Sequence, residues 1–327
     1  MTRREVTIVM YHYVRPIAAS AWPRIKGLEF AKFQGQLDYI QRHYSPISMK
    51  QLIAAAAGAE RLPDNPILLT FDDGYSDHYH YAFTELAARR LSGAFFVPAC
   101  AMIDRRILDV NRIHYILAAV EDAGALATHV DRAVLDAADE FGLPAPAALR
   151  EATRNLSRWD TPEVSYVKRM LQDGLPSPLR RRLIDELFAR FVTIDPLSFA
   201  EELYLTVDQA REMAAGGMHI GSHGESHERL ALMDADSQRR EIAESLRIFA
   251  AIGQSAREFT FCYPYGSYDR RTVSILEDLG CSAAVTTRVA LAAPNRSAVL
   301  ELPRIDTNDL PVTRDAEPGR WTRAAVP

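Results

Sequence analysis

The residue types best able to do chemistry in this sequence are two adjacent aspartates. Asp72 and Asp73 follow the apolar run 66–69 and precede Gly74, an arrangement typical of a buried strand that ends in a turn. Two carboxylates this close repel each other unless a cation lies between them. A metal ion would resolve the conflict, because one carboxylate can bind the ion while the other takes a proton from water on the metal. The alternative is an ordinary aspartate-rich turn.

Two histidines supply a second candidate group. His223 and His227 lie four residues apart and directly follow a short predicted strand at 218–221. At this spacing, side chains in a turn or first helical turn project from the same side. Imidazole is the commonest nitrogen ligand of zinc and related ions, so the pair forms half of a metal site. One carboxylate and two imidazoles leave positions open for water and substrate, as a catalytic metal requires.

The elements around these residues alternate between strand and helix, which indicates a parallel α/β sheet. The β-branched run 6–14 predicts the first strand and carries His12 near its end. Such folds place their active sites at the carboxyl ends of strands, although a hydrogen-bonded core histidine is the alternative for His12. Further strands are predicted at 94–98, 259–263 and 283–287, and helices at 30–44, 48–57, 81–90, 207–215, 237–252 and 271–279.

The stretch from about 104 to 200 breaks this alternation. Its helically spaced apolar residues, separated by prolines, predict four or five helices. We interpret residues 104–200 as a helical insertion docked within a single domain that covers residues 1–327, and residues 315–327 as a loose C-terminal tail. The basic cluster at 180–182 indicates a solvated helix face, with a phosphate-binding patch as the alternative.

Composition excludes several classes of function. The chain has 327 residues and a formal net charge of -5, which gives no electrostatic footprint for nucleic acid or an anionic membrane. Three widely spaced cysteines (Cys100, Cys262 and Cys281) form no disulfide framework and suit a reducing compartment. The first apolar run is too short for a signal peptide, and no segment is long enough to span a bilayer. We therefore expect a cytoplasmic protein.

Taken together, four motifs resemble the polysaccharide deacetylase family (carbohydrate esterase family 4, the NodB-homology domain). They are Thr-Phe-Asp-Asp-Gly at 70–74, Ser-His-Gly-Glu-Ser-His at 222–227, Tyr-Pro-Tyr-Gly-Ser-Tyr-Asp at 263–269 and Leu-Pro-Arg-Ile at 302–305. The Tyr11-His12 strand is similar to the opening of many members, and the resemblance covers residues 5–100 and 205–306. It implies a distorted (β/α)7 barrel that carries a large helical insertion.

The resemblance also implies an activity, which is metal-dependent hydrolysis of an N-acetyl group on an amino sugar. It implies Asp72 as the general base and one divalent ion, zinc first and cobalt, nickel or iron otherwise. Asp73, His223 and His227 would be the ligands of that ion. The backbone amide of Tyr265 would help the metal to stabilise the oxyanion.

This sequence departs from the family pattern at two positions. Cys262 stands where many members have an arginine that orients the catalytic aspartate, so we expect Arg304 to come within ion-pair reach of Asp72 instead. Many members also use a histidine late in the chain as general acid, whereas the last histidine here is His227. The acid is then His12, a water molecule or protonated Asp72.

Sugar N-deacetylation is the leading functional interpretation. A metal-dependent hydrolase of a non-sugar amide and a catalytically inactive carbohydrate-binding relative are the alternatives, and the intact set of two aspartates and two histidines argues against the second. Family members that act on wall polymers are usually exported, and this chain shows no export signal. We therefore expect a small N-acetylated sugar, free or carried on a nucleotide or lipid diphosphate, in surface-glycan or sugar-precursor metabolism.

Overall fold

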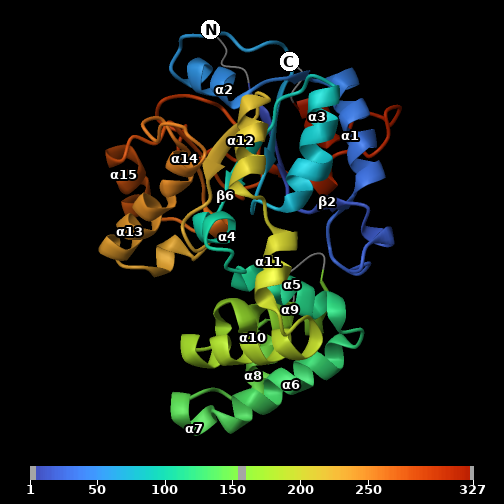
Figure 1. Cartoon of the computed structure of the whole chain (residues 1–327), viewed down its shortest axis with the longest axis vertical. Helices are drawn as coiled ribbons and strands as arrows, with labels where there is room; N and C mark the ends of the chain where they lie inside the picture. The colour runs from blue at the N-terminus through green and yellow to red at the C-terminus, as the bar shows by residue number, and fades with distance from the viewer. Residues whose placement is uncertain (1–4, 154–159, 325–327) are drawn as a thin grey trace. The chain divides into compact units, whose positions relative to one another are not determined.

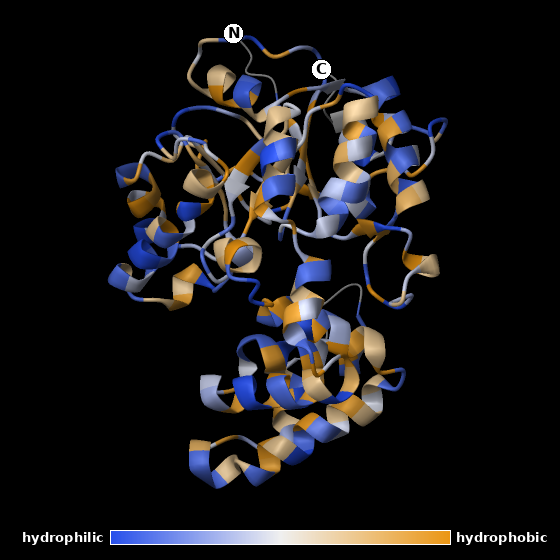
Figure 2. Ribbon diagram, viewed as in Figure 1, coloured by the Kyte–Doolittle hydropathy of each residue, from blue (hydrophilic) through white to orange (hydrophobic). Residues whose placement is uncertain are grey.

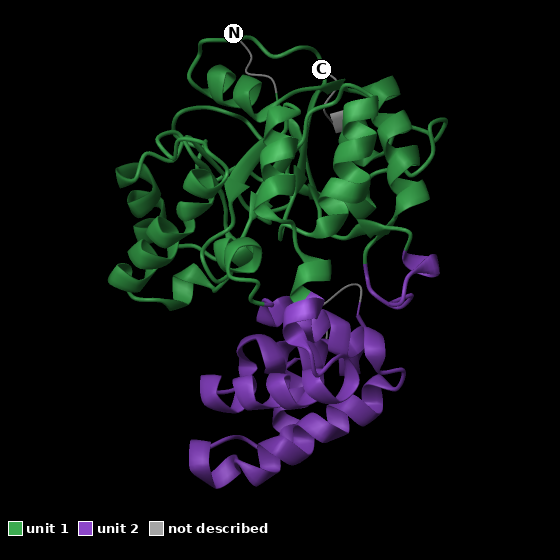
Figure 3. Cartoon of the chain, viewed as in Figure 1, with its two compact units in different colours: residues 1–16, 27–106, 200–327 green, residues 17–26, 107–199 purple. Residues whose placement is uncertain are grey.

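The computed structural model describes residues 5–153 and 160–324 (Figure 1). The chain divides into two compact units (Figure 3). Unit 1 contains residues 1–16, 27–106 and 200–327, and unit 2 contains residues 17–26 and 107–199. The stretch predicted as an insertion at 104–200 therefore lies mostly in unit 2, which takes in a short N-terminal segment as well.

A curled parallel sheet forms the centre of unit 1. Its strand order is β10 (Ile305–Asp306), β1 (Thr7–Tyr11), β5 (Pro66–Phe71), β6 (Ala94–Val97), β7 (His219–Ser222), β8 (Thr260–Cys262) and β9 (Ala283–Val285), and β4 (Ser45–Pro46) pairs with β5. The named pairs are all parallel. Just before β10, Leu302 forms a parallel bridge with Val285 of β9, which brings the two ends of the sheet together. This is the distorted barrel expected from the sequence.

Helices of unit 1 follow most of the strands. They are α1 (Phe30–His43), α2 (Met49–Ala56), α3 (Thr84–Ala88), α4 (Ala99–Ile103), α12 (Val207–Ala215), α13 (Ala235–Ser245), α14 (Arg247–Ala251), α15 (Arg270–Asp278) and α16 (Arg320–Ala324). The predicted N-cap Ser48 begins α2 with a reciprocal capping box to Gln51. The helix predicted at 81–90 starts earlier, as a π-helix at His78–Phe83 that continues into α3.

The period of two in β5 decides which side chains enter the barrel. Leu68 packs in a cluster with Phe96 and Cys262, which lie on other strands of the sheet. Leu69 and Phe71 pack instead in a larger cluster that includes residues of the surrounding helices. Thr70 and Asp72 follow Leu68 at intervals of two, so the same alternation directs them towards the barrel interior.

The predicted first strand at 6–14 is interrupted. β1 ends at Tyr11, and β2 (Val14–Arg15) pairs separately with β3 (Leu28–Glu29). Between them, the Tyr11 carbonyl accepts a hydrogen bond from the Asp72 amide at 2.9 Å, and the His12 carbonyl is 3.0 Å from His78 Nε2. The first contact is the last bond of the β1–β5 ladder, whereas the His12 carbonyl is engaged by a side chain, so His12 lies in a short connection at the carboxyl end of β1.

Unit 2 consists of helices. They are α5 (Asp109–Ala119), α6 (Ala123–Asp136), α7 (Ala138–Phe141), α8 (Pro146–Ala152), α9 (Pro162–Arg169), α10 (Ser177–Phe191) and the first half of α11 (Pro196–Leu203), which continues into unit 1. Hydrophilic and hydrophobic residues alternate along α10 (Figure 2), with Leu183 and Leu187 buried and Arg181 and Arg182 exposed. This placement favours the solvated-face interpretation of the basic cluster. Among the described residues, no helix is both long and apolar enough to cross a membrane.

The C-terminal segment packs against the core of unit 1 beyond residue 315, where the sequence predicts a loose tail. Within this segment, α16 forms at Arg320–Ala324 and buries Trp321 in the core of unit 1. Thr322 is also buried, with its hydroxyl 2.7 Å from the Tyr39 hydroxyl. An indole side chain buries enough apolar area to anchor a short segment. Residues 325–327, the rest of the predicted tail, lie outside the described residues.

Candidate active site

The carboxylate of Asp72 forms a buried, two-pronged ion pair with Arg304. Arg304 Nη1 donates to Asp72 Oδ1 at 2.8 Å, and Nη2 donates to Oδ2 at 2.7 Å. The guanidinium is itself held by Thr70 Oγ1 at 3.0 Å and by the Thr286 carbonyl at 2.8 Å. The expected ion-pair contact between Arg304 and Asp72 is therefore present, and it joins residues 232 positions apart.

The ion pair decides the charge of Asp72. Burial by itself raises the pKa of this carboxyl, but the charge and hydrogen bonds of Arg304 outweigh burial and lower the pKa to about 2. Conversely, burial lowers the pKa of Arg304 while the Asp72 carboxylate raises it, with a net rise. Asp72 is thus ionised at neutral pH and held in one orientation, as a proton acceptor needs to be.

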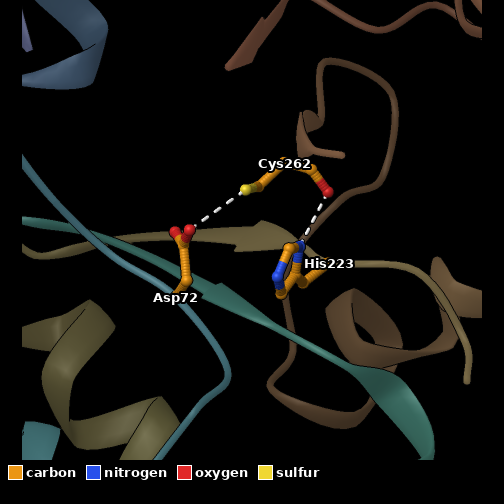
Figure 4. A group of neighbouring side chains, drawn as sticks. All are labelled: Asp72, His223 and Cys262. Carbon is orange, nitrogen blue, oxygen red and sulfur yellow. Dashed lines mark hydrogen bonds between the residues drawn. The ribbon is translucent and has the colours of Figure 1, made fainter. Parts of the chain in front are cut away.

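Cys262 lies beside this pair at the position where the family pattern has an arginine. Its Sγ is 3.4 Å from Asp72 Oδ2 and accepts from Arg304 Nη2 at 3.2 Å. Figure 4 shows the thiol directed towards Asp72 and the backbone carbonyl directed towards His223. Cys262 thus contacts both partners of the ion pair.

Asp73, His223 and His227 converge on one point. The Nε2 atoms of both histidines lie 3.4 Å from Asp73 Oδ1, and all three residues are buried. Their ligand atoms lie within 4.8 Å of one another, close enough to hold one ion. Asp73 and His227 adopt positive φ angles of 74° and 59°, and such backbone strain clusters at functional sites. Gly74 permits the turn, because a Cβ there would lie 2.9 Å from Val97 Cγ1.

The donor set fits a divalent cation. Among the described residues, Asp73 Oδ1 is a buried oxygen without a hydrogen-bond partner, a costly arrangement that a cation would relieve. His223 Nδ1 donates to the Cys262 carbonyl at 2.7 Å, so Nε2 is the nitrogen that faces Asp73 and that would carry the lone pair for a metal ion in the neutral imidazole. A histidine that donates its other N–H to a backbone carbonyl is the usual arrangement in metal sites.

A second group of potential ligands, Asp72, His223 and Cys262, lies nearby but suits a cation less well. Arg304 already places a positive charge at both Asp72 and Cys262. Burial also raises the pKa of the Cys262 thiol, whereas metals bind the thiolate. The group around Asp73 is therefore the better candidate for a metal site.

His12 and Tyr265 lie next to this group. His12 is half-buried and interacts electrostatically with Asp72, Asp73 and His227. The Tyr265 ring packs against His227 with centroids 4.7 Å apart, and its backbone has a positive φ of 57° within the turn after β8. The structure thus brings all the candidate residues of the sequence into one neighbourhood.

Two further residues hold the site and were not found from the sequence. Glu241 on α13 is buried and accepts hydrogen bonds from the backbone amide of Ser226 at 2.6 Å and from its hydroxyl at 2.8 Å, between the two histidines. Tyr75 donates to Asp73 Oδ2 at 2.5 Å. A glutamate on the apolar face of an amphipathic helix is a detectable signal, because unpaired glutamates are almost never buried. Tyr75 has no such signal beyond its closeness to Asp73.

Part of the chain is similar to known proteins. A family model described as polysaccharide deacetylase matches residues 189–284, which include His223, His227 and the turn that contains Tyr265. The resemblance to polysaccharide deacetylases is confirmed. The "Putative polysaccharide deacetylase YxkH" of Bacillus subtilis (strain 168) is 30% identical over 96 residues, which are 29% of this chain and 34% of that protein. The match thus spans about a third of the length of this curated relative.

Solved structures of deacetylases share the fold over nearly the whole chain. The Streptococcus pyogenes deacetylase PplD, in complex with acetate, has a TM-score of 0.58 at 17% identity, with 100% of both chains covered. A de-N-acetylase from Aggregatibacter actinomycetemcomitans has a TM-score of 0.56 at 15% identity and covers 98% of this chain and 100% of its own. IcaB from Ammonifex degensii has a TM-score of 0.51 at 18% identity, with 98% and 96% covered. At these identities the likeness establishes the deacetylase barrel fold.

Proposed function

We propose that this protein is a metal-dependent hydrolase that removes the N-acetyl group from an amino sugar. The observation that carries the proposal is the buried Asp72–Arg304 pair directly beside the convergent group Asp73, His223 and His227. The names of two structural neighbours, a deacetylase in complex with acetate and a de-N-acetylase, describe the same class of reaction for those proteins.

The roles follow from the environment of each residue. Asp73, His223 and His227 would hold one divalent ion, with zinc the first candidate for a donor set of one carboxylate and two imidazoles. When bound, the ion would polarise the acetyl carbonyl and acidify a water molecule. Asp72, kept ionised by Arg304, accepts the proton of the attacking water. The backbone amide of Tyr265 would donate to the developing oxyanion.

The first prediction concerns acetate release. Purified protein is expected to release acetate from at least one small N-acetylated sugar, tested as a panel of free, nucleotide-linked and lipid-linked substrates. Chelation should abolish the activity, and added zinc, cobalt, nickel or iron should restore it, because the ion supplies the Lewis acid. The readouts are enzymatic quantification of acetate and metal content by mass spectrometry.

His223→Ala and His227→Ala are the variants that test the ligand assignment, and both are expected to lose most of the bound metal. Full metal content in both would refute the site. Activity confined to long polymers would refute the small-substrate proposal but not the chemistry. Hydrolysis of non-sugar amides, with none of acetylated sugars, would favour the alternative that the protein is a metal-dependent hydrolase of a non-sugar amide.

A second prediction tests His12 as the general acid. His12→Gln should slow the release of acetate from an N-acetylated substrate by about 10²- to 10⁴-fold, the usual contribution of a positioned general acid. Hydrolysis of 4-nitrophenyl acetate should fall much less, because its leaving group departs without a proton. Equal losses on the amide and on the aryl ester would exclude His12 as the acid. His219→Gln is the matched control, since His219 is half-buried and bonded to Thr260 instead.

A further inference from the structure

Tyr75 controls one of the two oxygens of Asp73. Its hydroxyl donates to Asp73 Oδ2 at 2.5 Å, and both side chains are buried. The other oxygen, Oδ1, is the one that faces the Nε2 atoms of His223 and His227 at 3.4 Å. The two oxygens of the Asp73 carboxylate therefore have different surroundings, since one accepts a hydrogen bond from a tyrosine and the other faces the two imidazoles.

Other tyrosines hold Tyr75 in place. The Tyr75 ring stacks on Tyr13, with centroids 4.0 Å apart and planes inclined by 18°, and lies nearly parallel to Tyr204 at 6.4 Å. The backbones of Tyr75 and Tyr204 also form an antiparallel bridge. The side chain of Tyr13 also forms a hydrogen bond with that of Tyr75, in addition to the bond that Tyr75 donates to Asp73. The hydroxyl of Tyr75 is thus fixed before any ion arrives.

We propose that Tyr75 is a positioning residue that makes Asp73 bind the metal through Oδ1 alone. This inference rests on the proposed metal site. A carboxylate can bind a cation through one oxygen or through both, and an oxygen that accepts a short buried hydrogen bond is the weaker ligand. With Oδ2 engaged by Tyr75, the protein supplies three ligand atoms and leaves open positions for water and substrate. Outer hydrogen-bond partners of this kind also orient the ligand and tune its affinity.

The experiment compares apoproteins reloaded with metal. Tyr75→Phe removes only the hydroxyl and is expected to weaken zinc binding by about 10- to 100-fold, the usual effect of losing an outer partner. In the cobalt-substituted protein, the visible absorption of Tyr75→Phe should weaken as Asp73 becomes bidentate and the coordination number rises. Tyr39→Phe is the matched control, because Tyr39 is a buried tyrosine whose hydroxyl contacts Thr322 instead. It should keep the zinc affinity and the cobalt spectrum of the wild type.

A zinc-loaded crystal structure of the wild type keeps the inference testable if Tyr75→Phe fails to fold. The expected result is one Asp73 oxygen at about 2.0–2.2 Å from zinc, with Tyr75 still bonded to the other. Bidentate Asp73 in that structure, or wild-type affinity and spectrum in Tyr75→Phe, would overturn the inference and leave the proposed function intact. Full metal content in both His223→Ala and His227→Ala would instead refute the metal site, and the inference with it.

Discussion

Asp72→Asn is expected to keep the metal yet slow acetate release by about 10²- to 10⁴-fold, the usual range for loss of a general base. The physical reason is that an amide cannot accept the proton that the proposed role gives to the Asp72 carboxylate, whereas Asp72 is not among the three groups proposed to hold the ion. Asparagine also keeps one oxygen for the guanidinium of Arg304, so part of the local geometry survives. Turnover on the acetylated sugar and metal content per chain are the two measurements.

Asp73→Asn is the matched variant, because it makes the same chemical change at the adjacent position. It should lower metal affinity as well as turnover, since it removes the charge of the carboxylate that lies between His223 and His227. The contrast between the variants is the informative result. Equal metal loss in both would show that the roles of the two aspartates are misassigned.

The second large effect is on stability. Arg304→Met is expected to lower the free energy of unfolding by about 3–5 kcal/mol, because it leaves the Asp72 carboxylate buried without its partner. Arg304 and Asp72 are both almost fully buried, so solvent screens their interaction little. Equilibrium unfolding in urea measures the loss, provided that the transition is two-state.

Controls separate this loss from the general cost of removing an arginine. Arg239→Met breaks an exposed pair with Asp278 and should cost no more than about 1 kcal/mol. The double variant Cys262→Arg with Arg304→Met returns a guanidinium from the position that the family pattern uses. It should recover part of the stability that Arg304→Met loses. A loss in Arg304→Met no larger than that in Arg239→Met would contradict the argument.

Local patterns in the sequence are sufficient for the strands and for the candidate ligands. The apolar run before Asp72 predicts a buried strand, because a strand of a parallel sheet is covered on both faces and therefore needs apolar side chains on both. The strand β5 forms there. Ser48 caps α2 as expected, because capping depends on residues three positions apart. The spacing of His223 and His227 likewise places both imidazoles on one side of a single loop, with ring centroids 4.7 Å apart.

Local patterns fail where a distant contact decides the conformation. The run 6–14 has uniform β propensity, yet β1 ends at Tyr11, and the carbonyl of the next residue, His12, contacts the side chain of His78 instead of a neighbouring strand. The tail beyond residue 315 looks polar and loose, yet Trp321 is buried in the core. Secondary-structure propensity contributes less free energy than such tertiary contacts, which explains why the structure differs from the sequence prediction in both segments.

The amino-acid sequence by itself determined the fold class, the resemblance to polysaccharide deacetylases and the residue types available for catalysis. Only the tertiary structure decided which of those residues contact one another and through which atoms. It pairs Arg304 with Asp72 across 232 positions, and it commits one oxygen of Asp73 to Tyr75 and turns the other towards the histidines. The physical reason is that residue types and short spacings are local, whereas a hydrogen bond between distant residues depends on strand register and packing.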